Sequence, residues 1–513
     1  MDWDVRSGAS APARDLLHGC VELEECPGGW VRPQRFSAMQ RRAFSSCLAW
    51  YPGIFRQMAA CTAGVRLEFE TDATQVLVEF AADTEPRATR NVLKGMKPEV
   101  GDATAPHDGL SADVDGKHLS RVVLAPDVAA APGEAGPGVL LDLGGFKSRG
   151  NLVQLPGFGD MHRVRVWLPS LRGCELRRVY GNGSFVRPVS GEAPRGTLLV
   201  LGDSVAQGFT VGDPALAWPS LVADELQYGL VNQSVGAQVF QESSLGALPV
   251  GMDPSLVIVA LGANYRYGRC NERVTGREIA SYLARADELW PSVPLVVIVP
   301  AKQPGREAVR GSCYERVADL IDEAAARVRL RRLAASAPAV MVLRAPALPE
   351  DLLSDEDGHP TAAGAALLAR FVCSELPKLS CQCLRETGRF GRCGACAGTG
   401  TLPPVAFLSQ SGGGTKKRGG RKAKAAVAAA IEPKPEVAPV LANAADTEAE
   451  ATSVSAKVEA AKPTKPAPVS AKVEGDEPVK PASVSANKLT RRAAAVEDTP
   501  VGQTISMFTL LDE

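Results

Sequence analysis

The chain has 513 residues, with 57 Lys and Arg against 58 Asp and Glu and a formal net charge of −1. This balance excludes a strong general attraction to nucleic acid or to an acidic membrane surface. No apolar run reaches the roughly 18 residues that a membrane-spanning helix needs. A chain of this length accommodates about three domains.

The N-terminal residues, MDWDVRSGASAPARD, are polar and acidic, and they lack the basic start and apolar centre of a secretory signal. We therefore expect a cytoplasmic protein. The 12 cysteines are scattered over the chain, which is not the pattern of a disulfide scaffold. Eight of them stand apart, and we expect reduced, mostly packed thiols at Cys20, Cys26, Cys47, Cys61, Cys174, Cys270, Cys313 and Cys373.

Residues 1–195 contain short alternating β runs, with helical periodicity only near PQRFSAMQRRAF. GVRLEFETD and QVLVEF follow each other, and ADVDGKHLSRVVLA, GVLLDLG and HRVRVWLP come later. The pair Asp115-Gly116 between two such runs predicts a hairpin turn. Several short strands with Gly and Pro turns predict an N-terminal β-sandwich domain of jelly-roll type.

In residues 196–378, apolar strands alternate with helices, which predicts an α/β domain with a parallel sheet covered on both faces. The expected strands are Thr197–Leu201, Gly229–Val231, Leu256–Leu261, Leu295–Val299 and Val340–Leu343. The expected helices are Trp218–Gln227, Thr275–Leu289, Tyr314–Ala335 and Ala362–Leu376.

Four segments of this domain carry candidate catalytic groups. The run TLLVLGDSVAQGF places Ser204 where a buried strand turns toward a helix, whose amides favour negative charge. In SDEDGHPTAAG, three acids precede His359, and an acid two or three residues before a histidine can hold one ring nitrogen. Asn264 ends a strand in ALGANYRYG, and Gly236 or Ala237 in NQSVGAQ offers a backbone N–H. These groups follow strands, which is where parallel sheets hold ligands.

Taken in this order, GDSV, NQSVGA, GANY and EDGHPTAAG resemble the four blocks of the SGNH, or GDSL-type, serine hydrolases, from about Gly196 to Pro377. The resemblance implies a three-layer, flavodoxin-like hydrolase fold. It assigns Ser204 as nucleophile and His359 as base. Glu356 stands at the position of the triad acid, with Asp357 or Asp355 as the alternatives.

The same resemblance assigns the oxyanion hole to Ser204, Gly236 and Asn264, with Ala237 as the other residue that aligns with the family's glycine. Tyr265 stands where the family has an aspartate. The segments GWVRPQRF and CTAGVRLEFETDA are similar to the β-sandwich domain of bacterial SGNH esterases, including carbohydrate acetyl esterases.

This resemblance implies hydrolysis of small acyl esters, with acetyl groups on a carbohydrate as the leading substrate and no cofactor for catalysis. The alternative is a catalytically silent SGNH-fold adaptor, which would use its cysteine cluster and basic tail to bind nucleic acid or protein partners. The changes at Tyr265 and Glu356 leave room for that alternative.

Residues 379–402 hold a cluster of four cysteines with the spacing C-x-C, nine residues, then C-x-x-C. Four thiolates so grouped suit tetrahedral zinc, and the alternatives are a redox pair or unused thiols. CGACAGTG also resembles one unit of the DnaJ-type cysteine-rich domain, but a single unit does not carry a chaperone role over. The predicted zinc ligands are Cys381, Cys383, Cys393 and Cys396.

Residues 403–513 are rich in Ala, Pro and Lys and nearly devoid of aromatic residues, so we expect a disordered tail. Its basic run KKRGGRKAK is read as a solvated charge cluster, and nucleic-acid binding is not expected. The final QTISMFTLLDE is a candidate docking peptide for a protein partner, with a chance pattern as the alternative.

Overall fold

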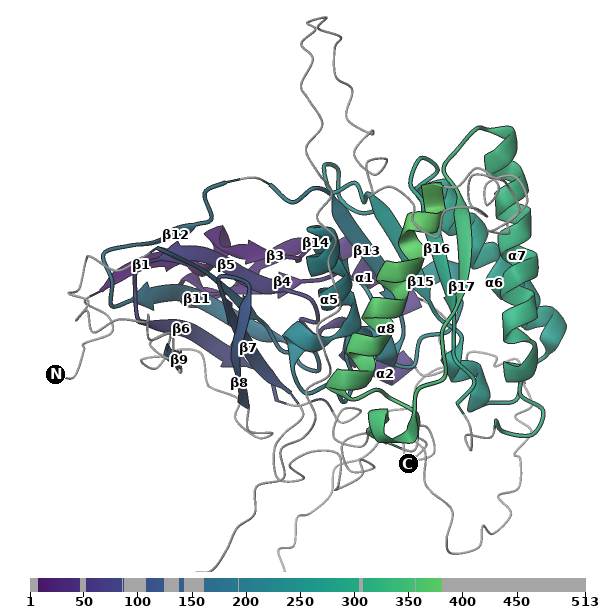
Figure 1. The fold of residues 1–513 in the computed structure, drawn as a ribbon, viewed down its shortest axis with the longest axis horizontal. Coiled ribbons are helices and arrows are strands. Elements are labelled where there is room, and N and C mark those ends of the chain that lie inside the picture. Colours follow the sequence, from purple (N-terminus) through teal and green to yellow (C-terminus); the bar gives the residue numbers. More distant parts are fainter. Residues whose placement is uncertain are drawn as a thin grey trace, which may run out of the picture. The chain divides into compact units, whose positions relative to one another are not determined.

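The computed structural model describes residues 8–46, 52–84, 86, 108–123, 138–142, 161–191, 193–303, 308–355 and 357–380 (Figure 1). All of them belong to one compact unit, formed by residues 1–413 and 502–513. The described residues leave out Cys47, Glu356, residues 381–402 with the cysteine cluster, and the tail. The domain boundaries drawn from the sequence therefore stay predictions.

The N-terminal part of the chain forms two antiparallel sheets. The first has the strand order β3 (Glu22–Glu25), β4 (Val31–Gln34), β11 (Cys174–Gly181), β6 (Gln75–Ala82) and β9 (Gly138–Asp142), with β1 (Ala9–Pro12) on β11. The second runs β12 (Val186–Pro188), β5 (Arg66–Thr71), β10 (His162–Trp167), β7 (Gly109–Val114) and β8 (Lys117–Val123), with β2 (Leu17–His18) on β5.

One apolar core joins the two sheets. Alternate residues of β5 and β10, such as Leu67 and Val164, are fully buried in the same cluster as Val78 of β6 and Val179 of β11. The predicted hairpin is confirmed between β7 and β8, where Asp115 and Gly116 have φ angles of 51° and 73°. Positive φ at both central residues is the requirement of a type I′ turn.

Two helices interrupt the N-terminal strands. Helix α1 (Ala38–Ser46) lies in the segment whose periodicity predicted a helix, and α2 (Pro52–Ala59) was not expected. Short 3-10 turns occur at η2 (Ala13–Asp15) and η3 (Pro27–Gly29). Apolar side chains of both helices and of Phe36, just ahead of α1, pack in one cluster with residues that follow β13 and β14 in the second half of the chain. The helix residues are Phe44, Ile54, Phe55 and Met58, and their partners are Phe209, Val235 and Ala237.

The second half of the chain forms the expected parallel sheet. Its strand order is β14 (Gly229–Asn232), β13 (Thr197–Gly202), β15 (Leu256–Ala260), β16 (Leu295–Val299) and β17 (Val340–Arg344). Neighbouring strands are parallel throughout. All five predicted strands and all four predicted long helices are confirmed, with ends that differ by a few residues. A long loop with η6 (Glu242–Ser244) follows β14.

Helices cover both faces of this sheet (Figure 1). Helices α5 (Trp218–Leu226) and α8 (Ala362–Glu375) bury one set of strand side chains, which includes Val200 and Ile258. Helices α6 (Glu272–Leu289) and α7 (Tyr314–Ala334) bury the alternate set, which includes Leu199 and Val257. The remaining elements are α4 (Ser204–Gln207) and the 3-10 turns η5 (Pro214–Leu216), η7 (Ala263–Arg266), η8 (Glu350–Leu352) and η9 (Leu376–Ser380). No helix among the described residues has both the length and the apolar character to cross a membrane.

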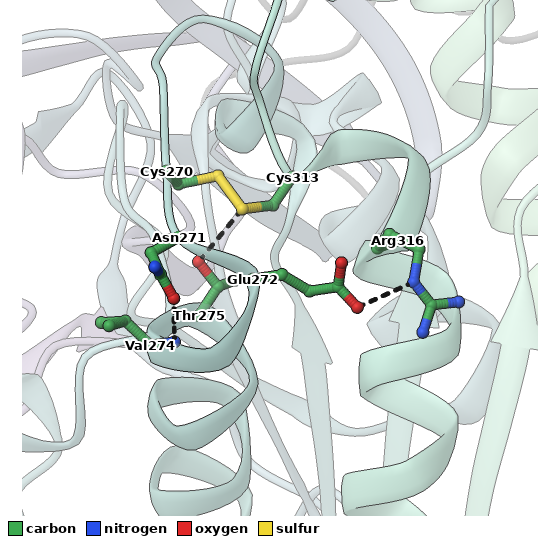
Figure 2. Close-up of a disulfide and its surroundings, with 7 residues drawn as sticks. All are labelled: Cys270, Asn271, Glu272, Val274, Thr275, Cys313 and Arg316. Carbon is green, nitrogen blue, oxygen red and sulfur yellow. Dashed lines mark hydrogen bonds and ion pairs between the residues drawn. A yellow bond between two sulfur atoms is a disulfide. The ribbon is translucent and has the colours of Figure 1, made fainter.

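A disulfide corrects the prediction of reduced thiols at Cys270 and Cys313. Figure 2 shows the bond between the segment ahead of α6 and the start of α7, with the two Cα atoms 5.7 Å apart. Nearby, Glu272 of α6 accepts a hydrogen bond of 3.0 Å from Arg316 of α7. The packing of α6 on α7 brings together cysteines that are 43 positions apart, which their spacing does not reveal. Cys61 and Cys174 are free and buried, as expected.

Candidate active site

Ser204 is the first residue of the one-turn helix α4, directly after β13. Asp203 caps this helix, since its carboxylate accepts a 3.1 Å hydrogen bond from the N–H of Val205. Gly202 is required at the preceding position because a Cβ there would lie 2.5 Å from the Cβ of Ala206. The serine N–H belongs to the first turn of the helix, where amides have no partner within the helix.

His359 lies within reach of this serine although the two are 155 positions apart. Its Nε2 is 2.8 Å from the Oγ of Ser204, and its Nδ1 is 2.6 Å from Oδ2 of Asp355. The three residues are 3–5% exposed. A hydroxyl, an imidazole and a carboxylate in this order form the geometry of a nucleophile, a base and an orienting acid.

The carboxylate beside His359 belongs to Asp355, which corrects the assignment of Glu356. Asp355 contacts the histidine twice, since its Oδ1 also accepts a 2.9 Å hydrogen bond from the His359 backbone N–H. The loop closes on itself, because Leu353 and Pro360 form a β-bridge and Gly358 has a φ of 83°. This closure brings the residue four positions before the histidine against the ring, whereas the motif predicted a spacing of three.

Electrostatics in the triad favour a protonated imidazole. Burial lowers the pKa of His359, but the charge and hydrogen bond of Asp355 outweigh this effect and raise the pKa to about 8. Burial likewise raises the pKa of Asp355, and the histidine outweighs it, so that this pKa lies below its usual value. The ring also stacks against Phe209, with centroids 5.7 Å apart.

Asn264 lies on η7, the turn that follows β15 at the same edge of the sheet as Ser204. Its side-chain amide donates a 2.9 Å hydrogen bond to the carbonyl of Gln238, and the residue is 3% exposed. An amide nitrogen has two N–H groups, so one remains for a ligand. The turn begins at Gly262, whose φ of 124° suits glycine alone.

The backbone N–H of Gly236 is already engaged, which corrects its assignment to the oxyanion hole. It donates a 2.8 Å hydrogen bond to the side-chain oxygen of Gln207. The next residue, Ala237, has a φ of 66°, a conformation that favours glycine. Among the described residues, no hydrogen bond uses the Ala237 N–H. Ala237, the alternative considered from the sequence, therefore offers the backbone donor.

Tyr265 occupies the position of the aspartate that the sequence comparison led us to expect. Its side chain is fully buried and stacks on Phe240, with centroids 6.4 Å apart. The aromatic pair belongs to the core between the sheet and helices α6 and α7. This substitution is therefore accommodated by packing beneath the Asn264 turn and leaves the triad contacts in place.

An apolar cavity of about 100 Å³ lies behind the triad. Val205 and Pro360, which flank the nucleophile and the base, line it, and so does Asp203. Burial raises the pKa of Asp203 to about 6. The cavity is bordered by the neighbours of the catalytic side chains and not by those side chains themselves, so it backs the triad loops.

One group of potential metal ligands occurs among the described residues. Asp355, Asp357 and His359 each offer an atom within 4.8 Å of the others. Both ring nitrogens of His359 already contact Asp355 and Ser204, so the cluster is better explained as a hydrogen-bonded triad. The predicted zinc ligands Cys381, Cys383, Cys393 and Cys396 lie outside the described residues.

Comparison with known proteins agrees with this geometry. The GDSL-like lipase/acylhydrolase family matches residues 200–367. The structure is similar to a salicylyl-acyltransferase from a tetracycline biosynthetic pathway (18% identity, TM-score 0.53, covering 74% of this chain and 99% of that one). It is also similar to a GDSL-like lipase from Bacteroides ovatus (16% identity, TM-score 0.50, 72% and 97%).

A family two carbohydrate esterase from Cellvibrio japonicus has 13% identity and a TM-score of 0.46, covering 72% of this chain and 97% of that one. Among curated proteins, no sequence matches. Residues 200–367 thus match the GDSL-like lipase/acylhydrolase family, and the protein is an ester-hydrolysing enzyme.

Proposed function

We propose that the protein is a serine esterase that hydrolyses small acyl esters with Ser204, His359 and Asp355 as its triad. The observation that carries this proposal is the pair of contacts made by one imidazole, 2.8 Å to the hydroxyl and 2.6 Å to the carboxylate. This arrangement makes the serine a nucleophile once the imidazole is neutral, because the ring nitrogen can then take its proton.

In the proposed mechanism, the Oγ of Ser204 attacks the ester carbonyl while its proton moves to Nε2 of His359. Asp355 keeps the ring in the right tautomer and stabilises the imidazolium. The tetrahedral intermediate then expels the alcohol, which receives the proton from Nε2. A water molecule, deprotonated by the same nitrogen, releases the acid and restores the serine.

The oxyanion is held by three donors in this proposal. They are the N–H of Ser204 at the start of α4, the N–H of Ala237 and the side-chain amide of Asn264. Each follows the carboxyl end of a different strand, so the donors converge on one edge of the sheet. Donors fixed in advance stabilise the developing charge without reorganisation during the reaction.

A small acyl group fits the closed surroundings of the nucleophile. Ser204 is 5% exposed, and Phe209 stacks on the base, in one apolar cluster with Met58 and Ala237. Such an enclosure suits an acetyl group better than a long acyl chain. We propose that the alcohol part of the ester is a carbohydrate hydroxyl, so that the substrate is an acetylated carbohydrate. The sequence resemblance to carbohydrate acetyl esterases supports this proposal.

The test is a series of 4-nitrophenyl esters with acyl chains of two to twelve carbons, followed by a panel of acetylated sugars. We expect the highest kcat/KM for the acetyl ester and a steep fall with chain length, with no turnover by Ser204→Ala. Equal rates along the series would contradict the small acyl group. Turnover by Ser204→Ala at the wild-type rate would contradict the nucleophile.

The catalytically silent adaptor was considered because of Tyr265 and Glu356. Tyr265 is buried in the core, and Asp355 supplies the carboxylate that Glu356 was expected to supply. Neither change therefore favours the adaptor. The basic run and the C-terminal peptide, which would bind its partners, lie outside the described residues.

We further propose that the two N-terminal sheets constitute a β-sandwich domain, supported by the core they share. A cytoplasmic location also stays a proposal, and the disulfide gives it a direct test because cytosolic thiols are kept reduced. For a cytoplasmic protein, alkylation at the moment of cell lysis should trap Cys270 and Cys313 as thiols, and the disulfide of the folded chain would then form only under oxidising conditions. Recovery of the intact disulfide would contradict a reducing compartment.

A further inference from the structure

The segment 232–238, called the oxyanion loop below, carries the Ala237 N–H and the Gln238 carbonyl that anchors Asn264. It continues from β14, the edge strand of the parallel sheet. An edge strand has a neighbour on one side only, so half of its backbone groups need partners from elsewhere. The partners on its two sides come from different parts of the chain.

The inner side of the oxyanion loop is fixed by the hydrolase domain. The N–H groups of Gln233 and Val235 donate to carbonyls at the end of β13, at 2.8 Å and 2.9 Å. The side chain of Asn232 donates to the carbonyl of Ala206 at 2.9 Å. With the Gly236–Gln207 contact described above, these bonds tie the loop to the strand and helix that carry Ser204.

The outer side of the oxyanion loop is held by Arg35, from the N-terminal part of the chain. One guanidinium nitrogen, Nη1, donates to the carbonyls of Asn232 at 2.8 Å and Ser234 at 2.7 Å. The opposite side of the same group donates to the carbonyls of Met58 and Cys61, each at 2.6 Å. Arg35 is fully buried and thus links the loop to the last turn of α2 and to Cys61 just after it.

A second contact reinforces this link. Gln40 of α1 and Gln233 of the oxyanion loop donate to each other's side-chain oxygens, at 3.2 Å and 3.1 Å. The Gln233 amide also donates to the backbone carbonyl of Arg35 at 2.7 Å. The N-terminal region therefore binds the loop at three successive residues, 232 to 234, of which the last is three positions before the Ala237 donor.

We propose that Arg35 is a positioning residue for the oxyanion hole, and that the N-terminal region thereby forms part of the catalytic machinery. Arg35 acts through the loop and does not touch the ester. This inference rests on the proposed esterase function and adds to it a requirement for a residue almost 170 positions before the nucleophile.

Lysine cannot replace Arg35 in this role. A guanidinium presents five donors in a fixed plane, whereas an ammonium is a compact point charge with three donors. Arg35→Lys keeps the charge and the alkyl chain but cannot reach carbonyls on two sides at once. The loop would lose part of its outer support, and the Ala237 N–H would no longer be held where the oxyanion forms.

The experiment compares wild type, Arg35→Lys, Gln40→Leu and a matched control, Arg332→Lys. Arg332 is also buried and donates to three backbone carbonyls, those of Trp290, Val293 and Pro338. These carbonyls precede β16 and β17, at the end of the sheet away from Ser204. Active sites are titrated with a fluorophosphonate, so that kcat refers to competent enzyme, and phenylboronic acid serves as the tetrahedral analogue.

For Arg35→Lys, we expect kcat per titrated site to fall about 10- to 100-fold, less than the loss of a whole oxyanion donor. KM should stay nearly constant, the inhibition constant of phenylboronic acid should rise by a similar factor, and the pH midpoint should not move. Gln40→Leu should show the same pattern more weakly. Arg332→Lys should lower the thermal midpoint without lowering kcat.

Values of kcat per titrated site within about twofold of wild type for both Arg35→Lys and Gln40→Leu would overturn the proposal. A loss of kcat accompanied by a shifted pH midpoint would also overturn it, because the effect would then run through His359. If Arg35→Lys does not fold, Gln40→Leu decides alone. Failure of the wild type to react with the fluorophosphonate would instead contradict the esterase function itself.

Discussion

The two sides of the active site are built in different ways. The histidine loop is closed by its own hydrogen bonds, between residues no more than nine positions apart, and by bonds to Thr210, Arg266 and Tyr267 from the same half of the chain. Asp355 both closes the loop and orients the ring. The oxyanion loop is held by residues from both halves of the chain, with Arg35 on its outer side. The reacting groups are thus encoded in short motifs, while the groups that stabilise the charge depend on long-range packing.

The largest effect should come from the histidine loop. We expect Asp355→Asn to lower kcat by about 10⁴-fold, because the ring would lose the tautomer that accepts the serine proton. Glu356→Gln and Asp357→Asn are the matched controls and should stay within about tenfold of wild type. The rates at which the three variants hydrolyse 4-nitrophenyl acetate measure these losses. A larger loss for Glu356→Gln than for Asp355→Asn would restore the assignment made from the sequence.

On the oxyanion side, Asn264→Ala should lower kcat by about 10²- to 10³-fold, the usual effect of removing one donor. The fold should persist, because the side chain makes a single hydrogen bond to the described part of the chain, at Gln238. Circular dichroism checks the fold, and initial rates check the activity. Wild-type rates in a folded Asn264→Ala variant would remove this residue from the oxyanion hole.

The pH dependence of kcat/KM should reflect the ionisation of His359 and not the oxyanion donors. His359 must be neutral to accept a proton, and its pKa is raised to about 8. We therefore expect kcat/KM to rise roughly tenfold per pH unit below this value and to level off above it. The same profile should hold for Asn264→Ala at lower rates. A rate that is already at its plateau at pH 6 would contradict a raised pKa.

The smallest effect on catalysis should follow loss of the disulfide, which lies beyond the Asn264 turn. Cys270→Ser should lower the free energy of unfolding by about 2–4 kcal/mol, because the bond closes a long loop. Urea unfolding with and without reductant measures this difference. Reduced wild type should match the variant, and kcat should change only a few-fold. Identical midpoints for oxidised wild type and Cys270→Ser would show that the bond contributes nothing.

Much of the fold could be predicted from the sequence because its signals are local. Alternating apolar strands and helices after residue 196 are visible directly, and so is the turn at Asp115 and Gly116. Helix α2 was missed, since Pro52–Ala59 is short and follows no long periodic run. The disulfide was missed because only the packing of α6 against α7 brings Cys270 to Cys313.

The site shows the same limit at the level of single residues. Ser204 and His359 could be paired from the sequence because each lies in a distinctive motif, and Asn264 was singled out because it follows a strand. Glu356 was chosen over Asp355 because spacing alone does not reveal how a loop closes. Gly236 was chosen because it is a glycine, although the strained position is filled by Ala237, with a φ of 66°. Nothing in the sequence connects Arg35 with a loop that follows β14.

The most direct test of the whole account is the mass of the protein after treatment with a fluorophosphonate. One adduct per chain, located on the peptide that contains Ser204 and absent from Ser204→Ala, is the predicted result. An unmodified wild-type protein that nevertheless hydrolyses acetyl esters, or an adduct on another residue, would contradict the account.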